Sequence, residues 1–148
     1  MKLQIKALSP KIGAEIPLPY YATAGAAALD LHACIDEPTV IAPGCRVLIP
    51  TGLAVAIPAG HVGILALRSS MGVKNGIMLS NGIGVIDSDY RGPLGVGLFN
   101  PNAAPYTVAP GDRIAQLMVV PVVCPEVELV EELSETDRGQ GGFGSTGR

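Results

Sequence analysis

Aromatic and charged residues are scarce in this sequence. It has no tryptophan, two phenylalanines and four tyrosines, whereas 48% of its 148 residues are hydrophobic. This composition excludes an intrinsically disordered chain, and the length favours one domain with a sizeable core. The net charge of -3 offers no general electrostatic attraction to nucleic acid, so we expect no nucleic-acid partner.

Cysteine is also rare and forms no recognisable pattern. Cys34, Cys45 and Cys124 are odd in number and contain no C-x-x-C pair, so neither a disulfide framework nor a zinc site is indicated. Small buried thiols in a reducing cytosol are the expectation. The start of the chain lacks a signal-peptide segment, and no apolar run reaches the roughly 18 residues that span a bilayer. We therefore expect a soluble, cytoplasmic protein with no membrane segment.

Glycine and proline, by contrast, are abundant. Nineteen glycines and thirteen prolines divide the chain into short apolar pieces. The pieces expected to form strands are residues 2–8, 39–58 (broken at Pro43-Gly44 and Thr51-Gly52), 62–68, 76–80, 84–90, 94–100, 106–123 and 127–133. This spacing is typical of a sandwich, jelly roll or barrel. We predict an all-β fold, with at most one short helix near residues 69–76, N-capped by Ser69 or Ser70.

The domain organisation changes once along the chain. Residues 1–136 read as a single β domain, and residues 137–148 as a flexible, glycine-rich C-terminal lid. The segments "RIAQLMVVPVV" and "GILAL" scarcely alternate, and burial of both strand faces needs a second covering layer. Another subunit would supply that layer, which favours an oligomer. A closed monomeric barrel is the alternative.

Few cations lie in the second half of the chain, so each needs a role. Between residues 51 and 137 they are Arg68, Lys74, Arg91 and Arg113. Arg68 follows the apolar segment "GILAL" and precedes Ser69 and Ser70. A guanidinium, two hydroxyls and the N–H groups of a helix start form a plausible anion site. The alternative is an ordinary N-cap beside a solvated arginine.

Two carboxylates stand where packing does not explain them. Asp87 ends the apolar run of "SNGIGVIDSDYRG", after the hairpin-turn signal Asn81-Gly82, and would serve as a general base or an outer-sphere metal partner. A turn aspartate is the alternative. Asp30 lies inside the apolar "AAALDLHA" and needs a partner or a site. His32 and His61 have no second ligand at suitable spacing and are expected to be structural.

The C-terminal tail superficially fits two nucleotide-binding patterns. "GQGGFG" matches G-x-G-x-x-G, but no strand precedes it and no helix can follow it, and the lysine of a P-loop is missing. What remains is an anion-binding glycine backbone, with Arg138, Ser145 and Thr146 for phosphates and Phe143 for stacking on a base. The alternative is a disordered terminus.

Five segments in order resemble the motifs of the trimeric dUTPase family of dUTP pyrophosphatases. They are "AAALDLHA", "RSSMG", "NGIGVIDSDYRG", "GDRIAQL" and "RGQGGFGSTGR", and the resemblance extends over essentially the whole chain. It implies a homotrimer of distorted jelly rolls (a β-clip fold) with active sites shared between subunits. It also implies hydrolysis of dUTP to dUMP and pyrophosphate, with Mg²⁺ bound to the triphosphate. That activity would keep uracil out of DNA and supply dUMP for dTTP synthesis.

The resemblance also implies a role for individual residues. Asp87 matches the aspartate that activates the attacking water, and Asp30 matches the aspartate that supports the metal through water. The residues implied to bind substrate are Arg68, Ser69, Ser70 and Gln116 for phosphates, Asn81, Val85 and Ile86 for uracil, Tyr90 for the deoxyribose, Gly95 beside the nucleoside, and Arg138, Phe143, Ser145 and Thr146 from the tail. One departure is Ala28, where the first motif usually has glycine.

Two alternatives belong to other functional classes. A dCTP deaminase of the same superfold needs a glutamate beside the hairpin, and no glutamate lies between Glu37 and Glu126. A non-enzymatic nucleotide-binding or capsid-like jelly roll would leave Asp87, Arg68 and Arg138 without a role. The first alternative is distinguished by its release of ammonia from dCTP, and the second by its lack of turnover.

Overall fold

The computed structural model describes residues 1–142, and residues 143–148 lie outside the described part. The elements in chain order are β1 (Gln4–Ala7), β2 (Leu29–His32), β3 (Thr39–Ile41), β4 (Arg46–Ala56), β5 (His61–Leu67), the short helix η1 (Ser70–Lys74), β6 (Met78–Leu79), β7 (Gly84–Ile86), β8 (Pro93–Phe99), β9 (Tyr106–Val108) and β10 (Arg113–Pro121). The all-β prediction is confirmed.

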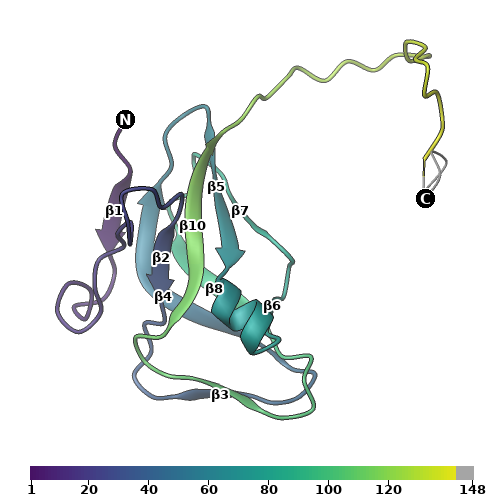
Figure 1. Ribbon diagram of the computed structural model, residues 1–148. Coiled ribbons are helices and arrows are strands. Elements are labelled where there is room, and N and C mark those ends of the chain that lie inside the picture. The colour runs from purple at the N-terminus through teal and green to yellow at the C-terminus, as the bar shows by residue number, and fades with distance from the viewer. Residues whose placement is uncertain (143–148) are drawn as a thin grey trace.

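The strands form two four-stranded sheets and one small ribbon. The first sheet has the order β1-β4-β8-β6, the second has the order β2-β10-β5-β7, and β3 pairs with β9 at one end of the body (Figure 1). The named strand pairs are antiparallel. From β4 to β8 the chain alternates between the two sheets, which brings segments distant in sequence to neighbouring positions.

The core lies where the inner faces of the two sheets meet. Strand β8 shows the period-2 pattern of a half-buried strand, because Leu94, Val96 and Leu98 are buried while their neighbours are less so. From the other sheet, Ile114 and Leu117 of β10 join the same apolar cluster. Each such side chain contributes about 1.5–3 kcal/mol of burial free energy.

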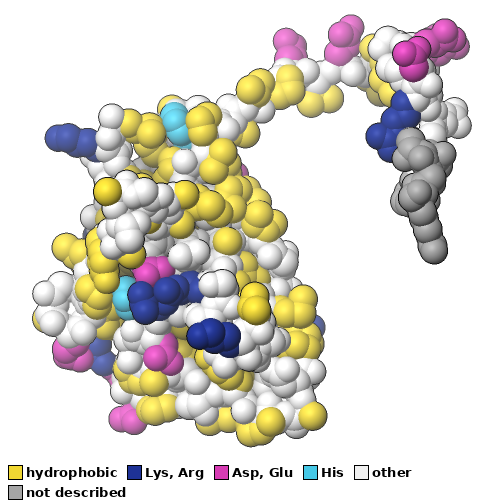
Figure 2. Space-filling model, viewed as in Figure 1, with side chains coloured by type: hydrophobic (Ala, Val, Ile, Leu, Met, Phe, Trp, Pro, Cys, Tyr) yellow, Lys and Arg dark blue, Asp and Glu magenta, His cyan; other side chains and the backbone are white. Residues whose placement is uncertain are grey.

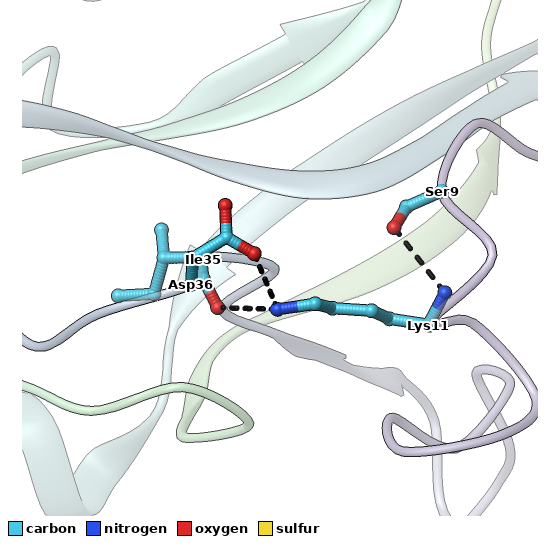
Figure 3. Close-up of polar contacts among 4 residues, drawn as sticks. All are labelled: Ser9, Lys11, Ile35 and Asp36. Carbon is cyan, nitrogen blue, oxygen red and sulfur yellow. Dashed lines mark hydrogen bonds and ion pairs between the residues drawn. The ribbon is translucent and has the colours of Figure 1, made fainter.

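Lys11 is one of the residues that attach the N-terminal segment between β1 and β2 to the body. The ammonium of Lys11 pairs with the carboxylate of Asp36 and donates to the carbonyl oxygen of Ile35 at 3.4 Å (Figure 3). The backbone N–H of Lys11 also donates to Ser9 Oγ at 3.3 Å. The hydrogen bond from Lys11 lowers the pKa of the Asp36 carboxyl below its ordinary value.

One of the two predicted breaks within residues 39–58 is present. The chain turns at Pro43-Gly44, where Gly44 has a positive φ of 70° and the N–H of Cys45 donates to the carbonyl of Ala42. The second break is wrong: β4 continues through Gly52. Its pairing with β8 shifts register between Pro50 and Ala54, so an irregularity of the ladder accommodates the glycine without ending the strand.

The helix prediction is correct in place and wrong in detail. Residues Ser70–Lys74 form a single π-helical turn, and the preceding Ser69 makes no side-chain capping hydrogen bond. The predicted N-cap is therefore wrong for Ser69, because this residue already has helical φ and ψ angles instead of the extended conformation of an N-cap. Ser70 is likewise no N-cap, since it is the first residue of the helix.

Two further expectations are corrected at the surface. No strand forms at residues 127–133, because the chain leaves the body after β10 and has no neighbouring strand there to pair with (Figure 1). The three cysteines are free, but Cys45 and Cys124 are exposed, not buried as expected. In residues 1–142, no helix has the length and apolar character to cross a membrane.

Candidate active site

A cavity of about 230 Å³ opens where β7 and β8 approach each other. Strand β7 supplies its backbone, the turn after β6 supplies Asn81, and the start of β8 supplies Gly95. Six residues predicted for uracil, sugar or catalysis line this cavity: Asn81, Val85, Ile86, Asp87, Tyr90 and Gly95. The structure therefore brings together the residues of the third predicted motif, and we refer to this space as the nucleoside cavity.

The predicted hairpin around Asn81-Gly82 is a turn between two different sheets. Gly82 has a positive φ of 74°, and its N–H donates to the carbonyl of Leu79, so the turn signal is confirmed. The strands that it joins do not pair with each other, because β6 pairs with β8 and β7 pairs with β5. The hairpin prediction is therefore wrong. The crossing nevertheless leaves the backbone of β7 open to the nucleoside cavity.

A tight turn after β7 carries Asp87 and Tyr90 together. The N–H of Tyr90 donates to the carbonyl of Asp87 at 3.2 Å, and the Tyr90 hydroxyl donates to the carbonyl of Pro93 at 3.0 Å. Arg91 closes the turn, since its Nη1 donates to the carbonyls of Ser88 and Tyr90 at 2.7 and 2.8 Å. Both Asp87 and Tyr90 are exposed and accessible to a ligand.

The second group of site residues surrounds Asp30 at the opposite end of β5. Asp30 is only 3% exposed and pairs with Gln116 across β2 and β10. Its Oδ1 accepts from Gln116 Nε2 at 3.2 Å and lies 3.2 Å from Arg68 Nε in an ion pair, and its Oδ2 accepts from Arg113 Nη1 at 3.3 Å. The expectation that Asp30 needs a partner is confirmed, and two arginines offset its charge.

His32 lies on the same strand face, two residues after Asp30. It is buried, and burial lowers the pKa of its imidazole below the ordinary value of 6.5, although Asp30 acts in the opposite direction. The neutral form therefore prevails at pH 7. His61 makes a local contact, with Nδ1 lying 3.0 Å from the carbonyl oxygen of Ala59 at the start of β5.

A second cavity of about 240 Å³ adjoins this group and has a polar lining. Its charged lining residues are Arg68, Arg113 and Asp112, and Ser70, Met71, Asn75 and Tyr106 complete it. Ser69 is exposed and does not line this cavity. Because two guanidinium groups and a hydroxyl face the same space, we call it the arginine cavity.

The two groups lie at opposite ends of the same strand. Ile86 pairs with Gly63 near the start of β5, so Asp87 lies beyond that end, whereas Arg68 follows Leu67 at the other end. At roughly 3.3 Å per residue, the length of β5 separates them by about 20 Å. Within one chain, Asp87 and Arg68 therefore do not converge on one point.

The tail residues are only partly described. Arg138 is exposed, and its Nε donates to the carbonyl of Gly141 at 2.7 Å, which closes a local turn away from the body. Phe143, Ser145 and Thr146 lie outside the described residues.

The family model for dUTPases matches residues 14–147 of this sequence. The chain belongs to the dUTPase family. The deoxyuridine 5'-triphosphate nucleotidohydrolase of Citrobacter koseri is 50% identical over 148 residues, which cover 99% of this chain and 97% of that protein. The corresponding protein of Escherichia coli O9:H4 is 49% identical, with coverage of 99% and 98%.

Solved dUTPase structures share the fold. A substituted dUTPase of Staphylococcus bacteriophage 80alpha, solved with dUpNHpp, has a TM-score of 0.88 at 30% identity and covers 99% of each chain. A substituted dUTPase of phage phi11 has a TM-score of 0.79 at 28% identity, covers 89% of this chain and 98% of its own, and is described as revealing the coordination of a structural Mg(II) ion. The predicted distorted jelly roll is therefore confirmed as the fold of the dUTPase family.

Sequence reasoning missed two residues that shape the site in this dUTPase-family chain. Arg113 is a partner of Asp30, and the only signal for it was the scarcity of cations. Gly92 leaves room for the Tyr90 ring, because a Cβ at Gly92 would lie 2.6 Å from Tyr90 Cζ. A contact of this kind depends on the folded turn and has no signature in the sequence.

Proposed function

We propose that this protein hydrolyses dUTP to dUMP and pyrophosphate, and so keeps uracil out of DNA while supplying dUMP for dTTP synthesis. The observation that carries the proposal is the convergence of Asn81, Asp87 and Tyr90 on one cavity in a chain of the dUTPase family. This family membership favours dUTP hydrolysis over the deaminase and the non-enzymatic jelly roll.

The nucleoside cavity suits a deoxyuridine. We assign uracil to Asn81 and to the backbone of Val85 and Ile86, whose edge borders the cavity. Tyr90 would pack against the deoxyribose and leave no room for a 2′-hydroxyl, with Gly95 bordering the same space. Specificity here rests on shape and on backbone hydrogen bonds, which reject a larger base or sugar when a site is built around the smaller one.

Asp87 is the general base of the proposed reaction. It would take a proton from a water molecule as the water oxygen attacks the α-phosphorus. The bond from the α-phosphorus to the bridging oxygen then breaks, and pyrophosphate leaves. A carboxylate suffices because the water is positioned rather than strongly acidified. Ser69 and Ser70 are assigned to phosphate binding and not to covalent attack, since neither has a hydrogen bond to a histidine base in the described part of the chain.

The phosphates need positive charge, because a triphosphate carries about four negative charges. Arg68 and Gln116 provide donors from the body, and Arg138 provides a further guanidinium from the tail. We propose Mg²⁺ as the cofactor, which when bound to the triphosphate neutralises charge on its oxygens.

The residues present fit a metal that is held mainly by substrate. Within residues 1–142, no three His, Cys, Asp or Glu side chains gather as a metal site. Asp30 Oδ1 and Oδ2 each accept one hydrogen bond, from Gln116 and Arg113, and Oδ1 is also ion-paired with Arg68, so acceptor capacity is left for a water molecule. Asp30 would therefore reach a metal only indirectly, through water.

We further propose a homotrimer in which neighbouring subunits complete each site. The general base and the phosphate ligands must reach one substrate, yet β5 separates Asp87 from Arg68 by about 20 Å within a chain. Asp87 of one subunit would therefore act together with Arg68 of another. The tail of the third subunit would close over the same site.

An apolar face of the second sheet supports this assembly. Cross-strand pairs place Ile64, Val85, Met118 and Val120 on the face opposite the core. These four residues form an apolar band, in which Val85 is 60% exposed and Val120 is 40% exposed. A neighbouring subunit would cover this band, as the poor alternation of β5 and β10 predicts.

The segment after β10 also carries apolar side chains without a partner in the described chain. Figure 2 shows hydrophobic and acidic side chains along this segment as it leaves the body. Val123, Val127, Leu129 and Leu133 are each more than 85% exposed. We propose that the segment lies on a neighbouring subunit, and that residues 137–148 form the lid at its end.

Three free cysteines fit a reducing compartment, so we propose that the protein acts in the cytoplasm.

The activity is tested by incubating the purified protein and Mg²⁺ with dUTP or dCTP, and measuring pyrophosphate and ammonia separately. Pyrophosphate from dUTP without ammonia from dCTP is expected. Ammonia from dCTP without pyrophosphate from dUTP would instead identify a deaminase, and neither product would identify a binding protein.

A further inference from the structure

We propose that Arg113 is a positioning residue for the phosphate end of the site. Its guanidinium fixes the carboxylate of Asp30, and Asp30 in turn orients Arg68 and Gln116 toward the triphosphate. The inference rests on the proposed function and adds a residue to which the dUTP-binding assignments above give no role.

The contacts divide the Asp30 carboxylate into two halves. Oδ1 holds the two phosphate-binding candidates, Arg68 at 3.2 Å and Gln116 at 3.2 Å, whereas Oδ2 is held by Arg113 at 3.3 Å. A carboxylate rotates about one bond, so fixing Oδ2 also fixes the direction of Oδ1. Arg113 therefore restrains Arg68 and Gln116 through its contact with Asp30.

The contacts with Asp30, an ion pair from Arg68 and a hydrogen bond from Gln116, leave other donor atoms of both side chains free for phosphate. Arg68 contacts Asp30 through Nε, so both of its terminal amino groups remain available to bind phosphate oxygens in the arginine cavity. Gln116 spends one N–H of its amide on Asp30 and retains the other.

The side chains of Asp30 and Arg68 are more buried than that of Arg113. The Asp30 side chain is 5% exposed and that of Arg68 is 21% exposed, so this pair is shielded from solvent. The side chain of Arg113 is 46% exposed, so its replacement leaves no buried, unpaired charge of its own. We therefore expect an Arg113 variant to fold and to lose orientation at the site.

The competing explanation is that Arg113 binds the triphosphate directly, since it also lines the arginine cavity. The two explanations differ in coupling. A residue that acts through Asp30 has no further effect once Asp30 cannot hold its partners, whereas direct phosphate contacts add independently.

The test is a double-mutant cycle of Arg113→Met and Asp30→Asn on the full-length chain. The readouts are kcat and KM for dUTP, and the dissociation constants of a non-hydrolysable imido analogue of dUTP and of 2′-deoxyuridine. Arg113→Met is expected to weaken analogue binding by about tenfold and to leave deoxyuridine binding unchanged, because the nucleoside has no phosphate. Arg113→Lys is expected to restore part of the loss. Lys74→Met, which removes an exposed cation outside both cavities, is the control for net charge.

The energetic coupling between the Arg113→Met and Asp30→Asn substitutions distinguishes the two explanations. In the Asp30→Asn background, Arg113→Met should change analogue binding by less than about twofold. Equal losses in both backgrounds would overturn the proposal in favour of direct contact, and a fall in Tm with unchanged analogue binding would reduce Arg113 to a structural role. If Asp30→Asn does not fold, the cycle with a background of Arg68→Met and Gln116→Met together, which removes both groups that Asp30 orients, gives the same comparison. A wild-type protein that binds the analogue without hydrolysing dUTP would refute the proposed function and leave this cycle interpretable.

Discussion

Asp87 is the residue on which the proposed chemistry depends. It is exposed at the end of β7 and lines the nucleoside cavity. We expect Asp87→Asn to lower kcat for dUTP by about 100-fold or more, because the amide cannot accept the proton of the attacking water. Binding of the imido analogue should be largely unchanged. Asp89→Asn is the matched control, since Asp89 does not line the cavity, and near-normal turnover by Asp87→Asn would refute the role.

Gly92 is expected to determine sugar specificity through Tyr90. A Cβ at this position would lie 2.6 Å from Tyr90 Cζ, so Gly92→Ala must displace the ring. Because Tyr90 is assigned to exclude the 2′-hydroxyl, the ratio of kcat/KM for dUTP over UTP should fall by about tenfold. Gly25→Ala, which meets nothing within 4 Å, should leave the ratio unchanged. Unchanged discrimination in Gly92→Ala would separate Tyr90 from sugar selection.

Individual site residues were predictable where their chemistry conflicted with their surroundings. A carboxylate inside "AAALDLHA" predicted that Asp30 needs a partner, and the structure supplies Arg68 and Arg113. The identity of those partners was beyond the sequence, because Asp30 and Arg113 are more than 80 positions apart and meet only through the β2–β10 pairing. The close approach of the Tyr90 ring to Gly92 likewise depends on a turn that exists only in the folded chain.

At the scale of elements, apolar runs located the strands well and their connections less well. A strand was predicted at residues 94–100, and β8 forms there with a period-2 burial pattern. The turn at Asn81-Gly82 was also predicted correctly, yet its two strands belong to different sheets. A turn signal reports local backbone geometry, whereas strand pairing is decided by distant segments that compete for the same edge. The predicted strand at 127–133 failed for the same reason, since it has no neighbour in its own chain.

The contact between η1 and β9 gives a pH-dependent prediction. Burial raises the pKa of Tyr106 above its ordinary value of 10.0, Asp112 adds to the shift, and the hydrogen bond from Asn75 opposes it. A raised folded-state pKa means that the folded state retains its proton when the unfolded state has lost it. The stability due to Tyr106 is therefore complete below about pH 10 and is lost as the pH rises through the folded-state pKa.

The measurement is urea unfolding of the wild type and Tyr106→Phe at pH 8 and near pH 10.5, at one protein concentration. The difference in the free energy of unfolding between the two proteins should shift against the wild type at the higher pH. The exposed Tyr20 provides the matched control, because Tyr20→Phe should show no such shift. An identical pH dependence of wild type and Tyr106→Phe would contradict the assignment.

For the whole molecule, the tail is proposed to serve catalysis and not folding. Regular structure ends at Pro121, and residues 122–142 extend away from the body (Figure 1). Deleting the residues after Glu135 should leave the fold and the oligomer intact and lower kcat/KM for dUTP by about 100-fold, because the phosphates lose their closing contacts. Mass in solution, circular dichroism and the dUTP assay check this. Loss of folding would show that the tail is structural.

The proposed assembly rests on one observation from the sequence and one from the structure. Strands that scarcely alternate predicted a covering subunit, but the pattern could not say which residues different chains contribute. The strand register supplies that information, because it places Asp87 and Arg68 at opposite ends of β5. The central claim is therefore that Asp87 and Arg68 of one active site belong to different subunits.

Subunit mixing tests this claim most directly. Asp87→Asn and Arg68→Met are each expected to be inactive, and the two are unfolded together and refolded as mixed oligomers. If each site takes Asp87 and Arg68 from two chains, an equal mixture should recover about a quarter of wild-type activity, since random assembly pairs two unmodified side chains at that frequency. Refolded single variants provide the baseline. Activity that stays at this baseline, in mixtures whose mass confirms hybrid oligomers, would contradict the account.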